Sequence, residues 1–577
     1  MKLLVLLLVF TCIVAVRCVT THTPSGDIEG FTLNGVDVYL GVRYGQFSER
    51  WTPAKLPLPW TGIQNATSFG PICHQFGPFT SPFKFEESEQ CLSLNVWVPS
   101  ERNASLLPVS LWLHGGGYTA GDSNDYDARN LSDVSQSIIV TINYRLGIFG
   151  FFPLPAVESR NFGWSDQQLA LQWVQENIAS FGGDKTNVML FGQSAGGGST
   201  MAHLLIESSW PLYSSAILQS GAPFIYDKCE EREEINLKLL ETSFPECESN
   251  ITCFRQLNAS LFYETLTINW ITLWPCVGQR SQLEDQPLTL IRKGIFNRNV
   301  PIISGINSNE GQTSVLTFNQ FNMNINSSQY RPFATEYRIP DNLTDLYDPT
   351  TTDKDYFTAL TWLFGDYYIH CPTLFLFDYL SVWSSSIYAY FFVHATENWA
   401  FTPFHFNASH LTEIPYVFDN DFALTKFTLA EFNLSMKIIR YFNAFHLKEQ
   451  PWSSYTVNQT VIVFNISNDD SMQSQSTFGE RLIKQCPIIL KYVDSDNCHA
   501  YTTREECIRL QHCHWISDRC DFSSTTLTST TESTSLTPTS VSTSLAPTTV
   551  STSSSLFQIH NSFLFFVISC ALFLINK

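Results

Sequence analysis

Positively charged residues are scarce in this chain of 577 residues: 33 Lys and Arg stand against 53 Asp and Glu, for a formal net charge of −20. Such an excess of negative charge repels nucleic acid and anionic membrane surfaces, so it argues against both as electrostatic partners. The hydrophobic content of 44% and charged content of 15% are ordinary for a globular protein, which excludes a disordered chain. We interpret the charge chiefly as a contribution to solubility.

The C-terminus lacks an apolar run of comfortable transmembrane length. The run FLFFVISCALFLI at 563–575 would rise only about 20 Å as a helix, against a hydrocarbon core of about 30 Å. Small residues around Ser553, a polar spacer and this short tail fit a GPI attachment signal at 554–577, with attachment at Ser553. A tilted transmembrane helix extended back to Leu556 is the alternative.

Two further segments near the C-terminus cannot form a hydrophobic core, the first because of its composition and the second because of its small size. Residues 522–553 are mostly Ser and Thr with scattered Pro, which predicts an extended, O-glycosylated stalk. Residues 498–521 form a short Cys-rich segment for which two stapling disulfides are expected, with a zinc site as the alternative. Its four cysteines are Cys498, Cys507, Cys513 and Cys520.

The N-terminus is typical of a secretory signal. Lys2 precedes an apolar run, and we expect a signal peptide over 1–18, cleaved near Cys18. Without Cys12, Cys18 and Cys570, twelve of the fifteen cysteines remain, an even number that suits an oxidising route to the extracellular face of the cell membrane. Eleven sequons are candidate glycan sites on such a protein: Asn65, Asn103, Asn130, Asn250, Asn258, Asn326, Asn342, Asn407, Asn433, Asn458 and Asn465.

The stretch FGQSAGGGST at 191–200 contains the pattern Gly192-x-Ser194-x-Gly196 of a nucleophile elbow. In such an elbow a strand turns sharply into a helix, the serine backbone is strained, and the glycines avoid collisions in the turn. The pattern alone can arise by chance, so its surroundings decide. An apolar strand expected at 187–191 runs directly into Gly192, as an elbow requires.

Strand and helix patterns alternate ahead of this elbow. The runs at 109–117 and 137–145 are rich in β-branched and aromatic residues and predict buried strands. The segment 166–183 has one apolar helical stripe, with Asp166 in the first turn and Gly182 at the end. This order predicts an α/β fold with a mostly parallel sheet covered on both faces.

Several motifs, in order, make the chain resemble the type-B carboxylesterase and cholinesterase family over roughly 24–490. SEQCLSLNVWVP at 88–99 resembles its SEDCLYLN block, NYRLGIFGFF its NYR segment, and NFGWSDQQLALQWV its G-x-x-D-Q-x-x-A-L-x-W-V helix. The resemblance implies an α/β-hydrolase fold over 19–497, with a large central, mostly parallel sheet and helices on both faces. The small Cys-rich module follows this domain.

The resemblance also implies a catalytic triad, since a serine hydroxyl needs a base that is oriented by a third group. The acid is Glu310 in GINSNEG, after an apolar strand, and the base is His410 in SHLTEIPYVF, which resembles the family's H-x-x-E-x-x-Y-V-F. The order Ser194, Glu310, His410 is the order of this fold. An isolated Glu is usually a solvated carboxylate and an isolated His is usually structural, so the motifs carry both assignments.

The HGGG segment at 114–117 supplies the other part of an acyl-transfer site. By the family pattern the N–H groups of Gly116, Gly117 and Ala195 form an oxyanion hole, in which each donor commonly lowers the barrier by about 2.7 to 4 kcal/mol. His114 is an alternative second base. We disfavour that role because His114 precedes the hole and packing is expected to orient it.

The family pattern further implies disulfides and ion pairs. The disulfides are Cys73–Cys91, Cys247–Cys253 and Cys371–Cys486, while Cys229 and Cys276 are left over and the pattern does not settle whether they join. Arg50 with Glu89 and Arg145 with Asp166 fall where the family has buried ion pairs, which we interpret as structural.

Two departures from the acetylcholinesterases argue against choline esters as preferred substrates. No Trp stands between Cys73 and Cys91, where those enzymes hold the choline cation against a Trp face. Gln193 replaces the Glu that usually precedes the serine, which removes a carboxylate that would favour a cation. Four phenylalanines are candidate walls of the substrate site and equally candidate core residues: Phe76, Phe79, Phe83 and Phe224.

Together these features predict an extracellular, GPI-anchored serine hydrolase that cleaves carboxylic esters through an acyl-enzyme, without a metal or cofactor. The expected partners are a small-molecule ester and, through the anchor, the membrane; a protein partner is left open. The alternative is an adhesion or scaffold protein of the neuroligin-like branch. The stalk suits that role, but a binding module has no physical need for Ser, Glu and His together. A storage protein of this fold is a remoter alternative.

Overall fold

The structure is a computed structural model. It describes residues 17–77, 85–102, 105–266, 273–319, 322–352, 354–396, 407–420, 426–455, 459–466, 472–474, 479–493, 513–516 and 519–522.

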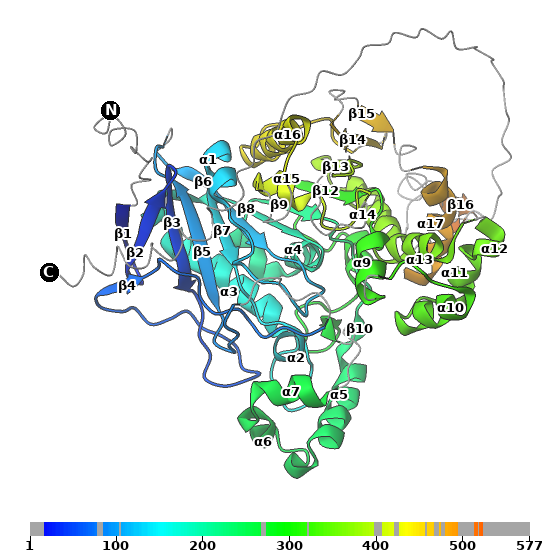
Figure 1. Ribbon diagram of the computed structural model, residues 1–577, viewed down its shortest axis with the longest axis horizontal. Helices are drawn as coiled ribbons and strands as arrows, with labels where there is room; N and C mark the ends of the chain where they lie inside the picture. Colours follow the sequence, from blue (N-terminus) through cyan, green and yellow to red (C-terminus); the bar gives the residue numbers. More distant parts are fainter. Residues whose placement is uncertain are drawn as a thin grey trace, which may run out of the picture. The chain divides into compact units, whose positions relative to one another are not determined.

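One large sheet forms the centre of the fold (Figure 1). Its strand order is β1-β2-β3-β5-β7-β6-β8-β9-β12-β13-β14-β15, with β4 paired to β2. Neighbours from β7 to β14 are parallel, whereas the strands from β1 to β7 and the pair β14–β15 are antiparallel. The strands are β1 Arg17–Thr23, β2 Gly26–Leu33, β3 Val36–Arg43, β4 Ile63–Asn65, β5 Ser93–Pro99, β6 Leu107–Leu113, β7 Ile138–Ile142, β8 Gly183–Gln193, β9 Ser215–Gln219, β12 Ile302–Asn307, β13 Ile387–Phe392, β14 Thr460–Phe464 and β15 Met472–Ser474.

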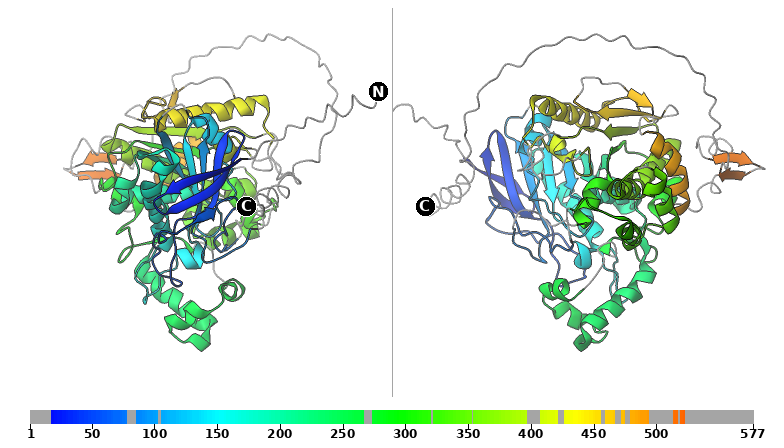
Figure 2. Two further views of the ribbon diagram at one scale, coloured as in Figure 1. Left: turned by 90° about the vertical axis from the view of Figure 1, so that its left-hand side faces the viewer. Right: turned by 45° about the vertical axis from the view of Figure 1, so that its right-hand side comes forward.

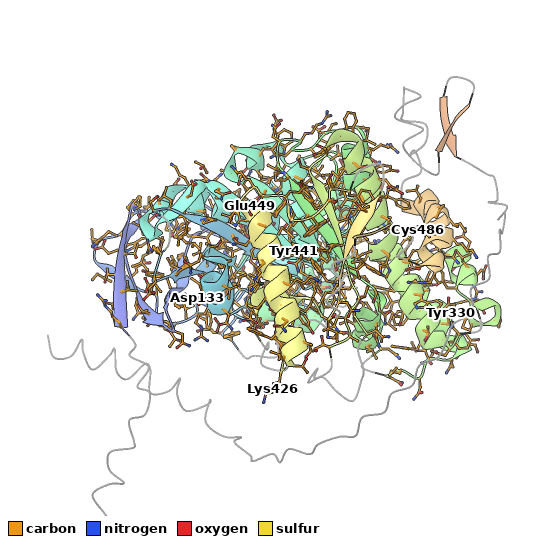
Figure 3. All side chains as sticks on the ribbon, turned by 90° about the horizontal axis from the view of Figure 1, so that it is seen from above. Asp133, Tyr330, Lys426, Tyr441, Glu449 and Cys486 are labelled. Atoms are coloured by element: carbon orange, nitrogen blue, oxygen red, sulfur yellow. A yellow bond between two sulfur atoms is a disulfide. The ribbon has the colours of Figure 1, made fainter. Side chains whose placement is uncertain are left out.

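Helices cover both faces of this sheet (Figure 2). α1 and α16 contact each other over one face, while α3, α4, α8 and α14 form a contiguous layer on the other. In Figure 3 α16 crosses the sheet between the labels of Lys426 and Glu449, with Asp133 of α1 beside it. The helices are α1 Arg129–Ser135, α2 Gly147–Gly150, α3 Phe162–Asn177, α4 Ala195–Leu205, α5 Cys229–Ser243, α6 Ile251–Gln256, α7 Ala259–Thr265, α8 Pro287–Arg292, α9 Gly311–Phe318, α10 Ser327–Glu336, α11 Asp341–Leu346, α12 Pro349–Thr352, α13 Tyr356–Gly365, α14 Cys371–Trp383, α15 Ile414–Phe418, α16 Leu429–His446 and α17 Glu480–Val493.

The sheet and its two helical layers confirm the expected α/β fold, and the core lies where layers and sheet meet. Trp112 of β6 is fully buried, and its ring lies 4.8 Å from that of Phe191 on β8 and 5.0 Å from that of Phe418 on α15. β5 and β7 are buried along their whole length. Burial on both faces explains why these strands have continuous apolar runs instead of alternating patterns.

The helix expected over 166–183 has different bounds in the structure. α3 begins four residues earlier, at Phe162, and ends at Asn177, after which a 3₁₀ turn leads to Gly182 with φ +82°. Asp166 is therefore not in the first turn. Its carboxylate accepts two hydrogen bonds of 2.7 Å from the guanidinium of Arg145, so a distant partner, rather than the helix N-terminus, accounts for its position.

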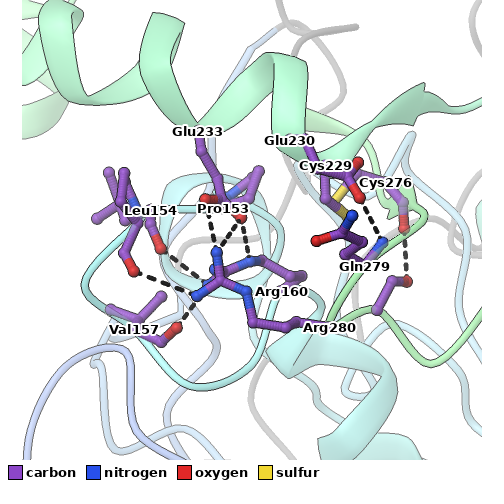
Figure 4. A network of polar contacts seen from close by, with 12 residues as sticks. Pro153, Leu154, Val157, Arg160, Cys229, Glu230, Glu233, Cys276, Gln279 and Arg280 are labelled. Atoms are coloured by element: carbon purple, nitrogen blue, oxygen red, sulfur yellow. Dashed lines mark hydrogen bonds and ion pairs between the residues drawn. A yellow bond between two sulfur atoms is a disulfide. The ribbon is translucent and has the colours of Figure 1, made fainter.

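A helical arm of α5, α6 and α7 lies apart from the sheet, at the bottom of Figure 1. A cluster of charged residues around the buried pair Arg160 and Glu233 holds its base (Figure 4). Arg160 Nε lies 2.5 Å from Glu233 Oε1, and Arg160 also donates to two carbonyl oxygens of the 154–157 loop at 2.8 and 2.5 Å. Arg280 donates to Glu233 Oε2 at 2.9 Å from the other side. The arm is thus attached through α5 to the loop before α3.

The remaining strands form two small sheets. β10 (Asp227–Lys228) pairs with β11 (Cys276–Val277), and β16 (Cys513–Ile516) pairs with β17 (Arg519–Phe522) inside the expected Cys-rich module. β17 includes Phe522, the first residue of the expected stalk, whereas the signal segment up to residue 16, the rest of the stalk from residue 523 and the GPI signal with Ser553 lie outside the described residues. Within the described ranges, no helix is both long and apolar enough to cross a membrane.

Candidate active site

The predicted site residues follow the carboxyl ends of neighbouring parallel strands. In the sheet Leu113 lies opposite Gly192, and Gln219 lies opposite both Gln193 and Gly305. The segments that leave β6, β8, β9 and β12 therefore start at one edge of the sheet. In open α/β sheets this edge is where ligands bind.

Ser194 occupies a strained elbow between β8 and α4. Its backbone has φ +58° and ψ −123°, a conformation that costs a non-glycine residue about 1 to 3 kcal/mol. A Cβ added at Gly196 would lie 1.9 Å from the carbonyl oxygen of Leu113, and one at Gly192 would lie 2.6 Å from backbone atoms of Gly196. Both glycines are thus required by close packing. Within 191–200, Ser194 is the one residue that is not buried.

The loop after β6 places backbone donors beside this serine. Gly116 has φ +105° and Gly117 φ +63°, and they are the two residues of 111–120 that are not buried. A Cβ added at Gly115 would lie 3.1 Å from Ser194 Cβ. Among the described residues, no hydrogen bond engages the N–H groups of Gly116, Gly117 or Ala195. These three N–H groups remain available for an oxyanion.

Glu310 is fully buried between β12 and α9, and each of its oxygens is hydrogen-bonded. Oε1 accepts from the Ser220 hydroxyl and from the Asn307 backbone N–H, both at 2.7 Å, and Oε2 lies 2.7 Å from His410 Nδ1. Burial alone would raise the pKa of Glu310. The hydrogen bond and charge of His410, with a contribution from His370, bring that pKa below its usual value instead. Glu310 is therefore a carboxylate that fixes a proton on Nδ1 of His410.

His410 is held against Glu310 by the segment that carries it. Ser409 forms a β-bridge with Asn309, and Thr313 Oγ1 donates to the His410 carbonyl oxygen at 3.0 Å. His410 Nε2 lies 3.3 Å from Nε2 of Gln193. The hydrogen bonds among described residues do not include one between Ser194 and His410. Such contacts are often long in unliganded enzymes and tighten when substrate binds.

A second network behind Glu310 was not predicted. Asp366 pairs with Arg481 and lies 2.8 Å from His370 Nδ1, while His370 Nε2 lies 2.8 Å from the Asn307 carbonyl oxygen. Both ring nitrogens of His370 thus lie beside oxygen atoms, one of the Asp366 carboxylate and one of the Asn307 carbonyl group. Burial opposes charge on Asp366, but Arg481 and His370 outweigh it and lower its pKa. This network lies behind the triad acid, and His370 contributes to lowering the pKa of Glu310.

Glu413, which belongs to the motif that singled out His410, is also buried close to the triad. Its Oε2 accepts a hydrogen bond of 2.5 Å from the Asn307 side chain, and Oε1 has no hydrogen-bond partner among the described residues. Burial and the negative charge of Glu310 raise the pKa of Glu413 to about 7. Two carboxyl groups therefore share one buried site, and only Glu310 holds its negative charge firmly.

His114 lies in the loop before the oxyanion glycines but does not act as a base in this geometry. Its ring stacks on Tyr144 with centroids 4.3 Å apart, and Nδ1 lies 2.8 Å from the Gly115 carbonyl oxygen. Burial lowers the pKa of His114 to about 4. The ring therefore stays neutral near pH 7 and is oriented by packing, as expected.

The structure contains four disulfides in the described residues. Three are the pairs implied by the family pattern, and the fourth joins the two cysteines whose pairing that pattern left open: Cys73–Cys91, Cys247–Cys253, Cys371–Cys486 and Cys229–Cys276. The ion pairs Arg50–Glu89 and Arg145–Asp166 are also present. Cys498 and Cys507 of the expected module lie outside the described residues.

Nine of the sequons fall in described residues. Eight of these asparagines are exposed, namely Asn65, Asn130, Asn250, Asn258, Asn326, Asn342, Asn407 and Asn433, and Asn465 is half-buried. Asn103 and Asn458 lie outside the described ranges. The exposed asparagines are accessible to glycosylation, which stays a prediction.

Two of the candidate aromatic walls can be placed. The ring of Phe76 stacks on Tyr263 at 4.4 Å, toward the arm, and the ring of Phe224 lies 5.1 Å from Trp274. A Cβ added at Gly198, in the first turn after Ser194, would lie 2.8 Å from the Phe224 ring. Phe224 is therefore near the elbow. Phe79 and Phe83 lie outside the described residues.

Metal ligands do not gather around this site. Over the part of the chain that the structure describes, no group of three or more His, Cys, Asp or Glu could hold a metal ion. The segment with the zinc alternative, 498–521, lies mostly beyond that part.

Comparison with known proteins agrees with the geometry. A model of the carboxylesterase family matches residues 16–478. The chain is similar to the acylcarnitine hydrolase of Mus musculus, with 30% identity over 462 residues that cover 74% of this chain and 82% of the relative. It is also similar to the acetylcholinesterase of Bungarus fasciatus, with 30% identity over 500 residues that cover 76% and 81% of the two chains.

Proposed function

This chain belongs to the carboxylesterase family, a family of ester hydrolases, and we propose that it hydrolyses carboxylic esters through a covalent intermediate on Ser194. One observation carries the proposal. A buried Glu310–His410 pair lies at the strand ends where a strained, accessible serine meets three unused backbone N–H groups. A hydroxyl, a base with an orienting acid and amide donors are the parts that acyl transfer needs.

The proposed reaction assigns a step to each of these groups. His410 Nε2 takes the proton of Ser194 as Oγ attacks the ester carbonyl carbon, and Glu310 stabilises the imidazolium that forms. The negative charge on the former carbonyl oxygen is stabilised by the N–H groups of Gly116, Gly117 and Ala195. His410 then gives the proton to the leaving alcohol. A water molecule attacks the acyl-enzyme by the same route and restores Ser194.

The substrate class that we propose is a neutral ester. The residue before the nucleophile is the uncharged Gln193, and no Trp stands between Cys73 and Cys91 to hold a cation. Measurement of kcat/KM for a neutral ester and a choline ester with the same acyl group tests this. A preference for the choline ester would contradict it.

We further propose that the enzyme is secreted, glycosylated and held at the cell surface by a GPI anchor. The N-terminal signal pattern, the exposed sequons and the disulfides support this. Treatment of expressing cells with a phosphatidylinositol-specific phospholipase is expected to release the protein. Retention after the treatment would favour the alternative of a transmembrane helix, and a mass unchanged by glycosidase would contradict glycosylation.

The decisive test of the activity is Ser194→Ala in the purified protein. Turnover of short p-nitrophenyl esters is expected to fall by on the order of 10⁶, and labelling by a fluorophosphonate probe should disappear. Equal turnover by the variant would refute the proposal. The adhesion alternative is not favoured, because the family and both named relatives are hydrolases or esterases. A wild-type protein that resists the probe would revive it.

A further inference from the structure

Gln193 lies between two parts of the proposed site. It is the last residue of β8, it is fully buried, and its Nε2 lies 3.3 Å from His410 Nε2. Its Oε1 packs against the oxyanion loop, since a Cβ added at Gly115 would lie 3.0 Å from that oxygen. Oε1 has no hydrogen-bond partner among the described residues. The amide is thus confined by packing, with its NH₂ group toward His410.

The proton arrangement on His410 makes this contact a hydrogen bond to its basic nitrogen. Glu310 Oε2 lies 2.7 Å from Nδ1, and a carboxylate only accepts, so Nδ1 carries the hydrogen. In the neutral ring Nε2 then holds the lone pair. The carboxamide of Gln193 donates to that lone pair, which is also the one that must take the proton of Ser194. Gln193 and Ser194 therefore compete for a single acceptor.

We propose that Gln193 is a positioning residue for the hydrolysis described above, and the inference rests on that proposed function. In the free enzyme its N–H caps Nε2 of His410, holds the ring neutral and turned toward the site, and yields the nitrogen to Ser194 when an ester binds. A hydrogen bond donated to the neutral form of a base disfavours its protonation. Gln193 thereby extends activity toward acid pH.

A glutamate at this position would act in the opposite direction. Its carboxylate would attract a proton to Nε2 and stabilise the imidazolium before any substrate arrives. Among the residues that the structure describes, the other charged or titratable groups near His410 are Glu310, which contacts it, and Glu413 on its own segment. His370 and Tyr390 lie behind these two carboxyl groups. All four groups remain unchanged when residue 193 is substituted. Such a substitution therefore tests the contact between His410 and β8 separately from the contacts with these groups.

The test compares Gln193→Glu, Gln193→Met and the control Gln175→Glu in the full chain. Gln175 lies half-buried on α3, and its amide contacts the Lys185 carbonyl oxygen, so the control adds the same charge far from His410. For each protein kcat/KM for p-nitrophenyl acetate and the rate of fluorophosphonate labelling are measured from pH 5 to 9. Unfolding temperature reports whether each variant is folded.

We expect the acid-side midpoint of the profile to move up by about one pH unit or more in Gln193→Glu. Gln193→Met loses the donor without gaining a charge, so its midpoint should move up by less. Gln175→Glu should follow the wild type. Midpoints that stay at the wild-type value in folded, active variants would overturn the inference, and so would a downward shift. Should Gln193→Glu not fold, Gln193→Met decides by the same criterion.

The two proposals fail in distinguishable ways. A wild-type protein that neither hydrolyses the ester nor reacts with the probe at any pH overturns the proposed function, and this inference with it. A wild-type protein that does both, with Gln193 variants whose profiles coincide with its own, overturns the role of Gln193 alone.

Discussion

Glu310 and Arg160 are both fully buried charges, yet their surroundings differ in kind. The hydrogen bonds of Glu310 lead to His410, and an accessible serine and unused backbone donors lie at the same edge of the sheet. Those of Arg160 end on Glu233 and on carbonyl oxygens, so that the cluster closes on itself (Figure 4). Buried charge therefore does not identify a reaction site by itself. An accessible nucleophile at the same edge of the sheet as the buried charge does.

The largest expected effect separates the two regions by activity. In Glu310→Gln the amide no longer fixes the hydrogen on Nδ1 of His410, and kcat should fall by on the order of 10⁴. Arg160→Met should leave kcat per folded molecule unchanged. Ester hydrolysis by both variants, normalised to folded protein, checks this. A comparable loss of kcat in the two would erase the distinction.

The second expected effect distinguishes the Arg160 cluster from the Glu310 network by the free energy of unfolding. Arg160→Met leaves Glu233 buried with Arg280 as its one remaining ion-pair partner among the described residues, and should lower the free energy of unfolding by about 3 kcal/mol. The double variant Arg160→Met/Glu233→Met should recover part of that loss, because the unpaired carboxylate is gone. Denaturant unfolding measures all three. A double variant less stable than Arg160→Met would contradict a charge-based explanation.

A third test concerns how the neighbouring carboxyl groups of Glu310 and Glu413 affect the free energy of unfolding. The pKa of Glu413 is raised from 4.5 to about 7, so the folded state holds a proton that the unfolded state releases. The contribution of this bound proton to the free energy of unfolding is fully present below about pH 4.5 and is lost as pH rises through about 7. The free energy of unfolding should therefore fall by about 3 kcal/mol over this range. Glu413→Gln should lack this fall. Unfolding free energies of both proteins at pH 5 and 8 check it, and parallel values would contradict it.

The smallest effect refines the region around Glu310. Ser220→Ala removes one donor to the buried carboxylate and should lower kcat/KM by roughly tenfold, or about 1 to 2 kcal/mol. Ser304→Ala is the matched control, because Ser304 is a buried serine of β12 whose hydroxyl has no hydrogen-bond partner among the described residues. Steady-state kinetics of the two variants compare them. Equal losses would mean that the Ser220 contact does not support catalysis.

Local patterns made much of this site predictable. The elbow at Ser194 follows from glycine spacing and an adjacent apolar strand, and both lie within about ten residues of sequence. Glu310 and His410 needed the family motifs, since one Glu or one His has no local signature. Even so, the Ser–His contact itself stays a prediction, because the structure shows the His–Glu half of the triad.

What the sequence did not reveal depends on long-range contacts. Ser220 is one serine after a strand, and only the pairing of β9 with β8 and β12 brings it to Glu310. A buried strand that ends at this edge, followed by a polar residue, was the signal available. His370 lies in a π turn within an apolar helical region, and its i,i+4 spacing from Asp366 was the signal available for that pair, whereas its contact with the Asn307 carbonyl oxygen required the fold. The pairing of Cys229 with Cys276 likewise required the fold.

The near-contact between Gly196 and the Leu113 carbonyl oxygen has a mechanical consequence. The start of α4 packs directly against the end of β6, so the Ala195 N–H group and the N–H groups of the glycine loop are held by the same backbone contact. A shift of either segment therefore displaces the other. On heating, turnover should therefore be lost at the same temperature at which the central sheet unfolds. No intermediate with a folded sheet and a disordered oxyanion loop should precede that transition.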